Sequence, residues 1–93
     1  MEILHKDDQK KGMFYIDLEG ERVAEMTYVW AGSDKIIIDH TEVSPKLKGM
    51  NIGKQLVMSA VKMAREQGIK IVPICPFAKS VFDKVEEIKD VLA

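Results

Sequence analysis

The sequence has little cysteine, because Cys75 is the only one among its 93 residues. A single thiol cannot close a disulfide within the chain and cannot form a zinc site by itself, so we expect no metal centre. A chain without disulfides fits a reducing compartment. The first eleven residues, MEILHKDDQKK, also lack the apolar core of a signal peptide. Both features predict a cytoplasmic protein.

The sequence also lacks an excess of charge of either sign and a long apolar run. Its 14 Lys and Arg residues nearly balance 15 Asp and Glu residues, which gives a net charge of −1. Such a chain has no global attraction toward nucleic acid or an anionic membrane. No apolar run approaches the roughly 20 residues of a membrane-spanning helix. We therefore expect neither nucleic acid nor membrane as a partner, and any anion site must be local.

Apolar and charged residues are present in ordinary amounts, at 46% and 31%. This composition is typical of a folded soluble domain and argues against disorder. A chain of 93 residues can bury one modest core but leaves no room for separate catalytic and regulatory domains. We expect a single domain over residues 1–93.

The first half of the chain predicts three strands. Lys11–Leu18 and Val23–Trp30 are rich in aromatic and β-branched residues, and the turn Glu19–Arg22 between them contains a glycine. These two strands are expected to form a hairpin. Lys35–Val43 is the third strand, and the run Ile36–Ile38 predicts burial on both of its faces. The tail before Lys11 is expected to fray, so His5 receives no role.

The second half predicts a helix, a strand and another helix. From Ile52 the apolar residues recur at helical spacing until Gly68, a typical helix-ending residue. Ile69–Cys75 follows as a fourth strand, and residues 77–93 predict a short helix with a less regular tail. A strand–helix–strand connection places its two strands side by side and parallel. The expected fold class is α/β with a mixed sheet, an antiparallel meander followed by a βαβ unit and a C-terminal helix.

A glycine-rich basic loop lies between the third strand and the first helix, with the sequence SPKLKGMNIGKQLV over residues 44–57. The first amides of a helix have no partner within it, and the helix dipole is positive there. Gly49 and Gly53 allow close approach of a ligand, and Asn51 tolerates a left-handed backbone or caps the helix. With its lysines, the loop predicts a site for a diphosphate. The alternative is an ordinary strand-to-helix connection with incidental glycines.

Two glycine motifs are excluded by spacing, because the loop has neither G-x-G-x-x-G nor G-x-x-x-x-G-K-[ST]. Instead, Ile36–Phe82 resembles the core of the GNAT superfamily of acetyl-CoA-dependent N-acetyltransferases, whose diphosphate loop reads [QR]-x-x-G-x-[GA]. Lys48–Gly53 follows this pattern, with Lys48 in place of Arg or Gln and Asn51 in place of the first glycine. The resemblance implies acetyl-CoA as cofactor. The residues it predicts to bind that cofactor are Val43, Lys48, Gly49, Met50, Asn51, Ile52, Gly53 and Lys54.

Cys75 is the strongest candidate for chemistry. It lies between Pro73 and Pro76, at the end of a strand whose ladder Pro73 interrupts. A thiol with a reference pKa of about 8.5 can protonate a leaving thiolate or accept the acetyl group itself. The alternative is a small buried core residue. Many GNAT enzymes use a tyrosine acid after this strand, whereas the aromatic residues nearby are Phe77 and Phe82.

His40 and Glu42 are the candidates for a base that deprotonates an incoming ammonium. By the period of two, both are expected on the strand face that also carries Ile36 and Ile38, unless a bulge intervenes. The alternatives are that both face solvent, or that His40 is a core histidine with its hydrogen bonds satisfied.

Two functions follow from the resemblance. The first is an N-acetyltransferase that moves an acetyl group from acetyl-CoA to a primary amine on a protein or small molecule. The second is a noncatalytic acyl-CoA-binding or partner-binding module on the same fold. The second is favoured by the absence of the tyrosine and of the N-terminal helical segment that helps to form the acceptor site in longer members.

Overall fold

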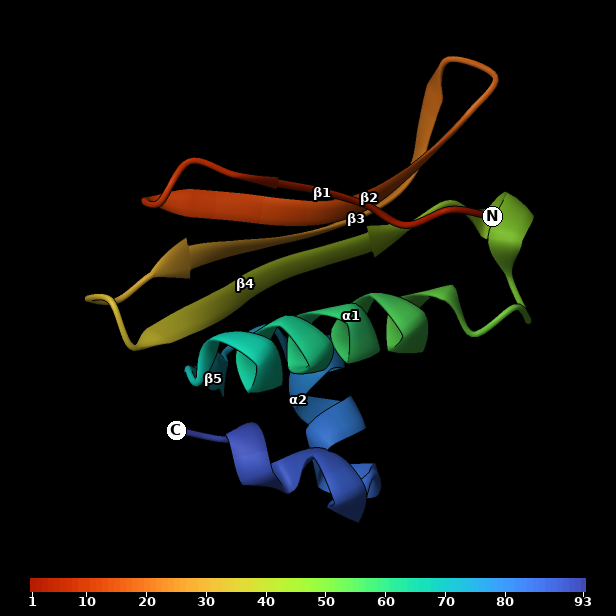
Figure 1. The fold of residues 1–93 in the computed structure, drawn as a ribbon. Coiled ribbons are helices and arrows are strands. Elements are labelled where there is room, and N and C mark those ends of the chain that lie inside the picture. The colour runs from red at the N-terminus through yellow and green to blue at the C-terminus, as the bar shows by residue number, and fades with distance from the viewer.

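The computed structural model describes residues 1–93 as a five-stranded sheet with helices packed against it (Figure 1). The strand order is β1-β2-β3-β4-β5; all neighbours are antiparallel except β4 and β5, which are parallel. This mixed sheet confirms the expected fold class. The elements are β1 (Leu4–Asp7), β2 (Lys11–Leu18), β3 (Glu21–Trp30), β4 (Lys35–Val43), η1 (Pro45–Leu47), α1 (Ile52–Gln67), β5 (Lys70–Pro73), α2 (Pro76–Lys84) and η2 (Glu86–Val91).

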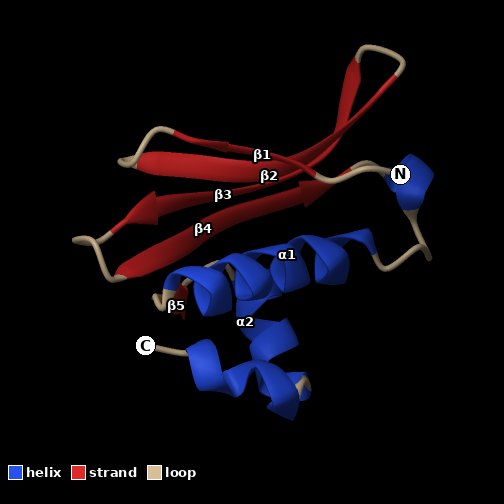
Figure 2. Cartoon of the chain, in the orientation of Figure 1, coloured by secondary structure: helices blue, strands red, loops and turns tan.

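One hydrophobic core joins the sheet to the helices. Helix α1 packs along one face of the sheet and contacts β2, β3, β4 and β5, while no helix covers the opposite face of β2–β4 (Figure 2). Sheet side chains that point toward α1, such as Ile16 and Met26, are almost fully buried, and so is Leu56 on α1 itself. Helix α2 packs against α1 and against the β4 and β5 strands. No helix is long and apolar enough to cross a membrane.

The hairpin of β2 and β3 is confirmed, with a two-residue turn at Glu19 and Gly20. Both turn residues have positive φ, at 51° and 80°. This backbone is the twist-compatible turn that favours glycine in tight hairpins. A bulge follows, because Asp17 pairs with Arg22 while Ile16 pairs with Ala24.

The expectation that the N-terminal tail frays is wrong, since Leu4–Asp7 forms edge strand β1 against β2. The His5 ring stacks on Phe14 with ring centroids 4.2 Å apart, and its Nε2 lies 2.7 Å from the Tyr28 hydroxyl. That hydroxyl donates to the Asp7 carboxylate at 2.5 Å. Tyr28 is fully buried and lies two strands away, so the polar sequence of β1 gives no local sign of this anchoring.

Strand β4 has one buried face rather than two. Ile36 and Ile38 are fully buried, whereas Ile37 is only half-buried because no helix covers its side of the sheet. Thr27 pairs with His40 and Tyr28 with Ile38, so one residue, Asp39, is inserted as a β-bulge. The bulge reverses the alternation of side chains in the rest of the strand.

The parallel pairing of β4 and β5 is confirmed, and so is its end at Pro73. The register runs from Lys35 opposite Lys70 to Ile38 opposite Pro73. Beyond it, the amides of Ile74 and Cys75 both donate to the Ile38 carbonyl, so the ladder stops and the strands part. Strand β5 is therefore shorter than the predicted Ile69–Cys75.

The helices end where local residues dictate. Helix α1 ends at Gly68, which adopts the left-handed conformation with φ 68° and donates its amide to the Ala64 carbonyl. After α2, the irregular tail forms η2, in which Ile88 and Val91 are buried. Arg65 on α1 holds η2 through Asp90, with nitrogen–oxygen distances of 3.1 and 2.8 Å.

Candidate active site

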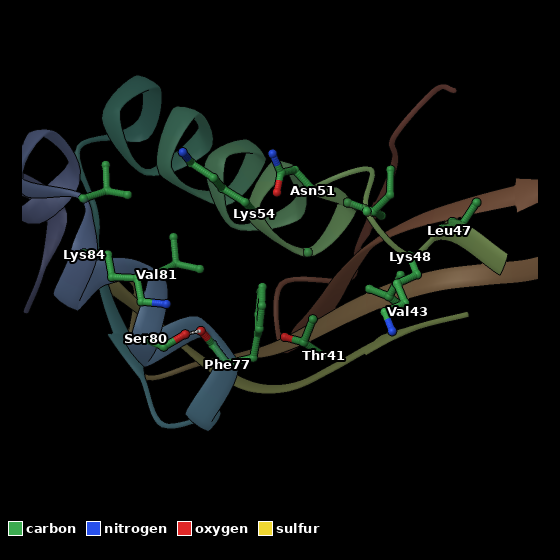
Figure 3. Close-up of a pocket in the computed structure, with 14 residues that line it drawn as sticks. Thr41, Val43, Leu47, Lys48, Asn51, Lys54, Phe77, Ser80, Val81 and Lys84 are labelled. Carbon is green, nitrogen blue, oxygen red and sulfur yellow. Dashed lines mark hydrogen bonds between the residues drawn. The ribbon is translucent and has the colours of Figure 1, made fainter. Parts of the chain in front are cut away.

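A pocket of about 580 Å³ lies at the carboxyl end of β4, between the loop that precedes α1 and helix α2 (Figure 3). All predicted cofactor-binding residues except Met50 line it. Met50 is 48% exposed and lies outside the lining. The lining residues from β4, the loop and the first turn of α1 are Thr41, Val43, Leu47, Lys48, Gly49, Asn51, Ile52, Gly53 and Lys54.

The loop leaves the start of α1 without an internal cap. Asn51 adopts the left-handed conformation, with φ 56° and ψ 31°, and its side chain makes no capping hydrogen bond. The first turn contains no acidic residue. The first amides of the helix therefore keep their donors for a ligand, at the end where the helix dipole is positive. Such an N-terminus favours an anion.

Helix α2 forms the wall of the pocket opposite α1. The residues it contributes recur at helical spacing and are Phe77, Ser80, Val81, Lys84 and, just after the helix, Val85. Val81 is almost fully buried, with 7% exposure. Phe77 is instead 42% exposed, so its ring is part of the pocket surface.

The Phe77 ring rests directly on Gly53. A Cβ atom added to Gly53 would lie 2.5 Å from Cζ of Phe77, which is closer than real Cβ contacts allow. Gly53 therefore makes room for a side chain of the protein itself, and no local sequence pattern indicates this contact. Gly49 is different, because a Cβ there meets no atom within 4 Å but the backbone has φ 84°.

The pocket is cationic although the chain is nearly neutral. Lys48, Lys54 and Lys84 line it, and no aspartate or glutamate does. None of the three lysines takes part in an ion pair. The local charge is therefore available to an anionic ligand.

Comparison with known proteins agrees with this geometry. The sequence profile of the family described as GCN5-related N-acetyl-transferase matches residues 13–91. The chain belongs to this family. A GCN5-like protein from Staphylococcus aureus, solved by NMR, is 41% identical over 99% of this chain and 87% of its own, with a TM-score of 0.76. No match was found among curated proteins.

More distant structures share the fold. A ribosomal-protein-alanine N-acetyltransferase from Brucella melitensis is 16% identical over 84% of this chain and 62% of its own, with a TM-score of 0.67. A predicted acetyltransferase from Clostridium acetobutylicum, solved with acetyl-CoA, is 17% identical over 80% of this chain and 55% of its own, with a TM-score of 0.64. Both are longer than this chain.

As a GNAT member the protein is an acetyltransferase, and acetyl-CoA is its acetyl donor. The residues present fit this donor. The uncapped amides of α1 and the unpaired lysines suit its phosphates, and the apolar side chains of Val43 and Val81 suit its uncharged parts.

In this GNAT domain Cys75 lies just behind the pocket, at the start of α2. It is buried, with 5% exposure, and its Sγ donates to the Thr41 hydroxyl at 3.4 Å. Thr41 lines the pocket, whereas Cys75 itself does not. The Thr41 side chain therefore lies between the Cys75 thiol and the open space of the pocket.

The surroundings of Cys75 favour its thiolate. Burial raises the pKa of the Cys75 thiol, but contact with the Thr41 hydroxyl and with the nearby backbone amides of Ala78 and Phe77 lowers the pKa by more, so that it lies below its ordinary value. The sulfur makes no regular capping hydrogen bond, so the amides act as neighbouring dipoles at the helix start. Thiolate character matches a nucleophile better than an acid.

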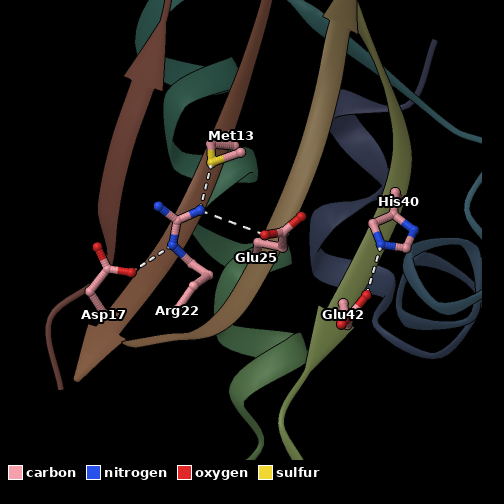
Figure 4. A network of polar contacts seen from close by, with 6 residues as sticks. All are labelled: Met13, Asp17, Arg22, Glu25, His40 and Glu42. Atoms are coloured by element: carbon pink, nitrogen blue, oxygen red, sulfur yellow. Dashed lines mark hydrogen bonds and ion pairs between the residues drawn. The ribbon is translucent and has the colours of Figure 1, made fainter. Parts of the chain in front are cut away.

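His40 and Glu42 lie on the opposite face of β4 from the pocket (Figure 4). The expectation that they share a face with Ile36 and Ile38 is wrong, because the bulge at Asp39 turns both outward. His40 Nε2 lies 3.4 Å from Glu42 Oε2, and their side chains are 54% and 75% exposed. The same face carries the ion pairs of Arg22 with Asp17 and Glu25.

A second polar cluster lies outside the GNAT pocket, around the buried Tyr28 hydroxyl. The Asp7 carboxylate accepts from this hydroxyl and, at 3.0 Å, from the Trp30 indole. Burial raises the pKa of Asp7, but the hydrogen bonds from Tyr28, Gln9 and Trp30 together lower it below its usual value. Burial lowers the pKa of His5, against a smaller opposing effect of Asp7. The cluster fastens β1 to the sheet.

Proposed function

We propose that this protein transfers the acetyl group of acetyl-CoA to a primary amine, on a protein or a small molecule. One observation carries the proposal. The pocket combines uncapped amides at the start of α1 with three unpaired lysines and no carboxylate. We assign the CoA diphosphate to the loop between Lys48 and Lys54, where those amides are free to donate to an anion.

The gap between β4 and β5 is the place for the reactive end of the donor. The strands part after Pro73, and Thr41 lines the pocket from the freed part of β4. Acetyl-CoA supplies an activated acetyl group there. The protein holds the acetyl group next to the attacking amine in a fixed orientation, which is the main requirement of acyl transfer.

Cys75 is the group that we assign to the transfer. As a nucleophile, its thiolate attacks the acetyl carbon, a carbon–sulfur bond forms to Sγ, and CoA leaves as a thiolate. The neutral amine then attacks the carbonyl carbon of the acetyl-cysteine, a carbon–nitrogen bond forms, the bond from that carbon to Sγ breaks, and the amine proton passes to the released Cys75 thiolate. As an acid, the Cys75 thiol would instead give its proton to the departing CoA sulfur. The lowered pKa of Cys75 favours the first course.

Peptide mass after incubation with acetyl-CoA alone separates the two courses. A nucleophilic Cys75 gains an acetyl group, which Cys75→Ser removes without loss of donor binding. An acid leaves no acetylated protein, and Cys75→Ser then slows turnover only. Full turnover by a Cys75→Ala variant with a verified amine would exclude both roles.

A noncatalytic acyl-CoA-binding module is the second candidate. Two observations favour it: Cys75 reaches the pocket only through Thr41, and no tyrosine lines the pocket. Calorimetric titration with CoA and release of free CoA thiol across a panel of primary amines distinguish the candidates. Tight binding with no release for any amine, and no acetylated Cys75, would favour the module.

A further inference from the structure

The three lysines of the pocket come from different elements. Lys48 precedes α1, Lys54 lies in the first turn of α1, and Lys84 is the last residue of α2. Figure 3 shows Lys48 at the end of the pocket beside Val43, whereas Lys54 and Lys84 lie toward the other end, beside Val81. The positive charge is thus divided between two places.

The pair at the α2 end forms no ion pair within the protein. Lys46 and Lys89 pair with Glu21 and Glu86, but Lys54 and Lys84 pair with nothing. Two ammonium groups that line one end of a pocket without an ion-pair partner give that end a positive charge. A doubly charged anion offsets both.

In the proposed function the loop and Lys48 bind the diphosphate, whose two phosphates carry one negative charge each. CoA has one further phosphate, a monoester on the 3′ position of its ribose. A phosphate monoester carries about −1.5 to −2 charge at neutral pH and offers three acceptor oxygens. Two lysine ammonium groups match that charge.

We propose that Lys54 and Lys84 form a subsite for the 3′-phosphate of CoA, so that the protein selects CoA thioesters over their dephospho forms. This inference rests on the proposed function, since it assigns a second contact to the same ligand. Lys84 distinguishes this subsite from the diphosphate site, because Lys84 belongs to α2 and lies outside the loop that we assign to the diphosphate.

Titration of the whole protein with CoA and with dephospho-CoA tests the subsite. The two ligands differ only in the 3′-phosphate. The parent protein should bind CoA at least about tenfold more tightly than dephospho-CoA. Lys84→Gln should weaken CoA binding about fivefold, which corresponds to about 1 kcal/mol, and leave dephospho-CoA binding unchanged.

Lys79→Gln is the matched control, because Lys79 is an exposed lysine of the same helix that does not line the pocket. It should change neither affinity, and both substitutions keep a helix-forming side chain. Raising the salt concentration should reduce the preference of the parent for CoA, because screening weakens the added charge contact.

Three results would overturn the subsite. Equal binding of CoA and dephospho-CoA by the parent shows that the 3′-phosphate makes no contact. Equal weakening of both ligands by Lys84→Gln places Lys84 at the diphosphate. If neither ligand binds the parent, the proposed function itself fails and the subsite fails with it.

Discussion

The contact between Gly53 and Phe77 makes the strongest test of the pocket geometry. Gly53 lies in the first turn of α1 and does not need a positive φ, so alanine fits the backbone there. An added methyl group would meet Cζ and Cε2 of Phe77 at 2.5 and 2.6 Å. The ring must therefore move, and it can move because it is 42% exposed.

Two opposing effects determine how much Gly53→Ala changes the free energy of unfolding. Overpacking costs about 1–3 kcal/mol when neighbours cannot relax fully. Replacing glycine by alanine in a helix gains about 1 kcal/mol. The free energy of unfolding should thus fall by about 0–2 kcal/mol in the parent background. In a Phe77→Ala background the clash is absent, so Gly53→Ala should raise the free energy of unfolding by up to about 1 kcal/mol.

Urea denaturation of the four proteins in this double-mutant cycle measures the coupling directly. The expected interaction energy is about 1–3 kcal/mol, well above the scatter of about 0.5 kcal/mol for independent sites. Additive effects within that scatter would refute the contact between the ring and Gly53. A change in the denaturant slope would indicate an altered compactness instead.

Three further predictions address the loop, the outer face and the edge strand. Gly49→Ala should weaken CoA binding and cost about 1–2 kcal/mol of stability, because φ 84° strains a residue with a Cβ atom; calorimetry that finds the parental affinity would contradict this. His40→Gln and Glu42→Gln should bind acetyl-CoA and turn over like the parent, since both lie outside the pocket; slow turnover with normal binding would restore their assignment as bases. Burial lowers the pKa of His5 from 6.5, so the unfolded chain binds more protons as the pH falls below about 6.5. Stability should therefore decrease from pH 6.5 toward 5, less steeply in His5→Gln, and identical slopes in thermal unfolding would refute the role of His5.

Much of the fold was predictable because the signals are local. The hairpin β2–β3 follows from alternating residues around a glycine turn, and α1 from apolar spacing that ends at Gly68. The parallel pair β4–β5 follows from the intervening helix, and the parting at Pro73 from its missing N–H. The loop of the pocket was also predictable, because a glycine-rich basic segment between strand and helix has a recognisable chemistry.

The tertiary structure alone decided the rest. Strand β1 depends on Tyr28, which lies more than twenty residues away, so no pattern within Leu4–Asp7 predicts it. The bulge at Asp39 arises from pairing with β3 and turns His40 and Glu42 away from the pocket. Helix α2 contributes Lys84 only because it packs across from α1. Periodicity describes each segment by itself, whereas register and the packing of segments distant in sequence determine which side chains meet.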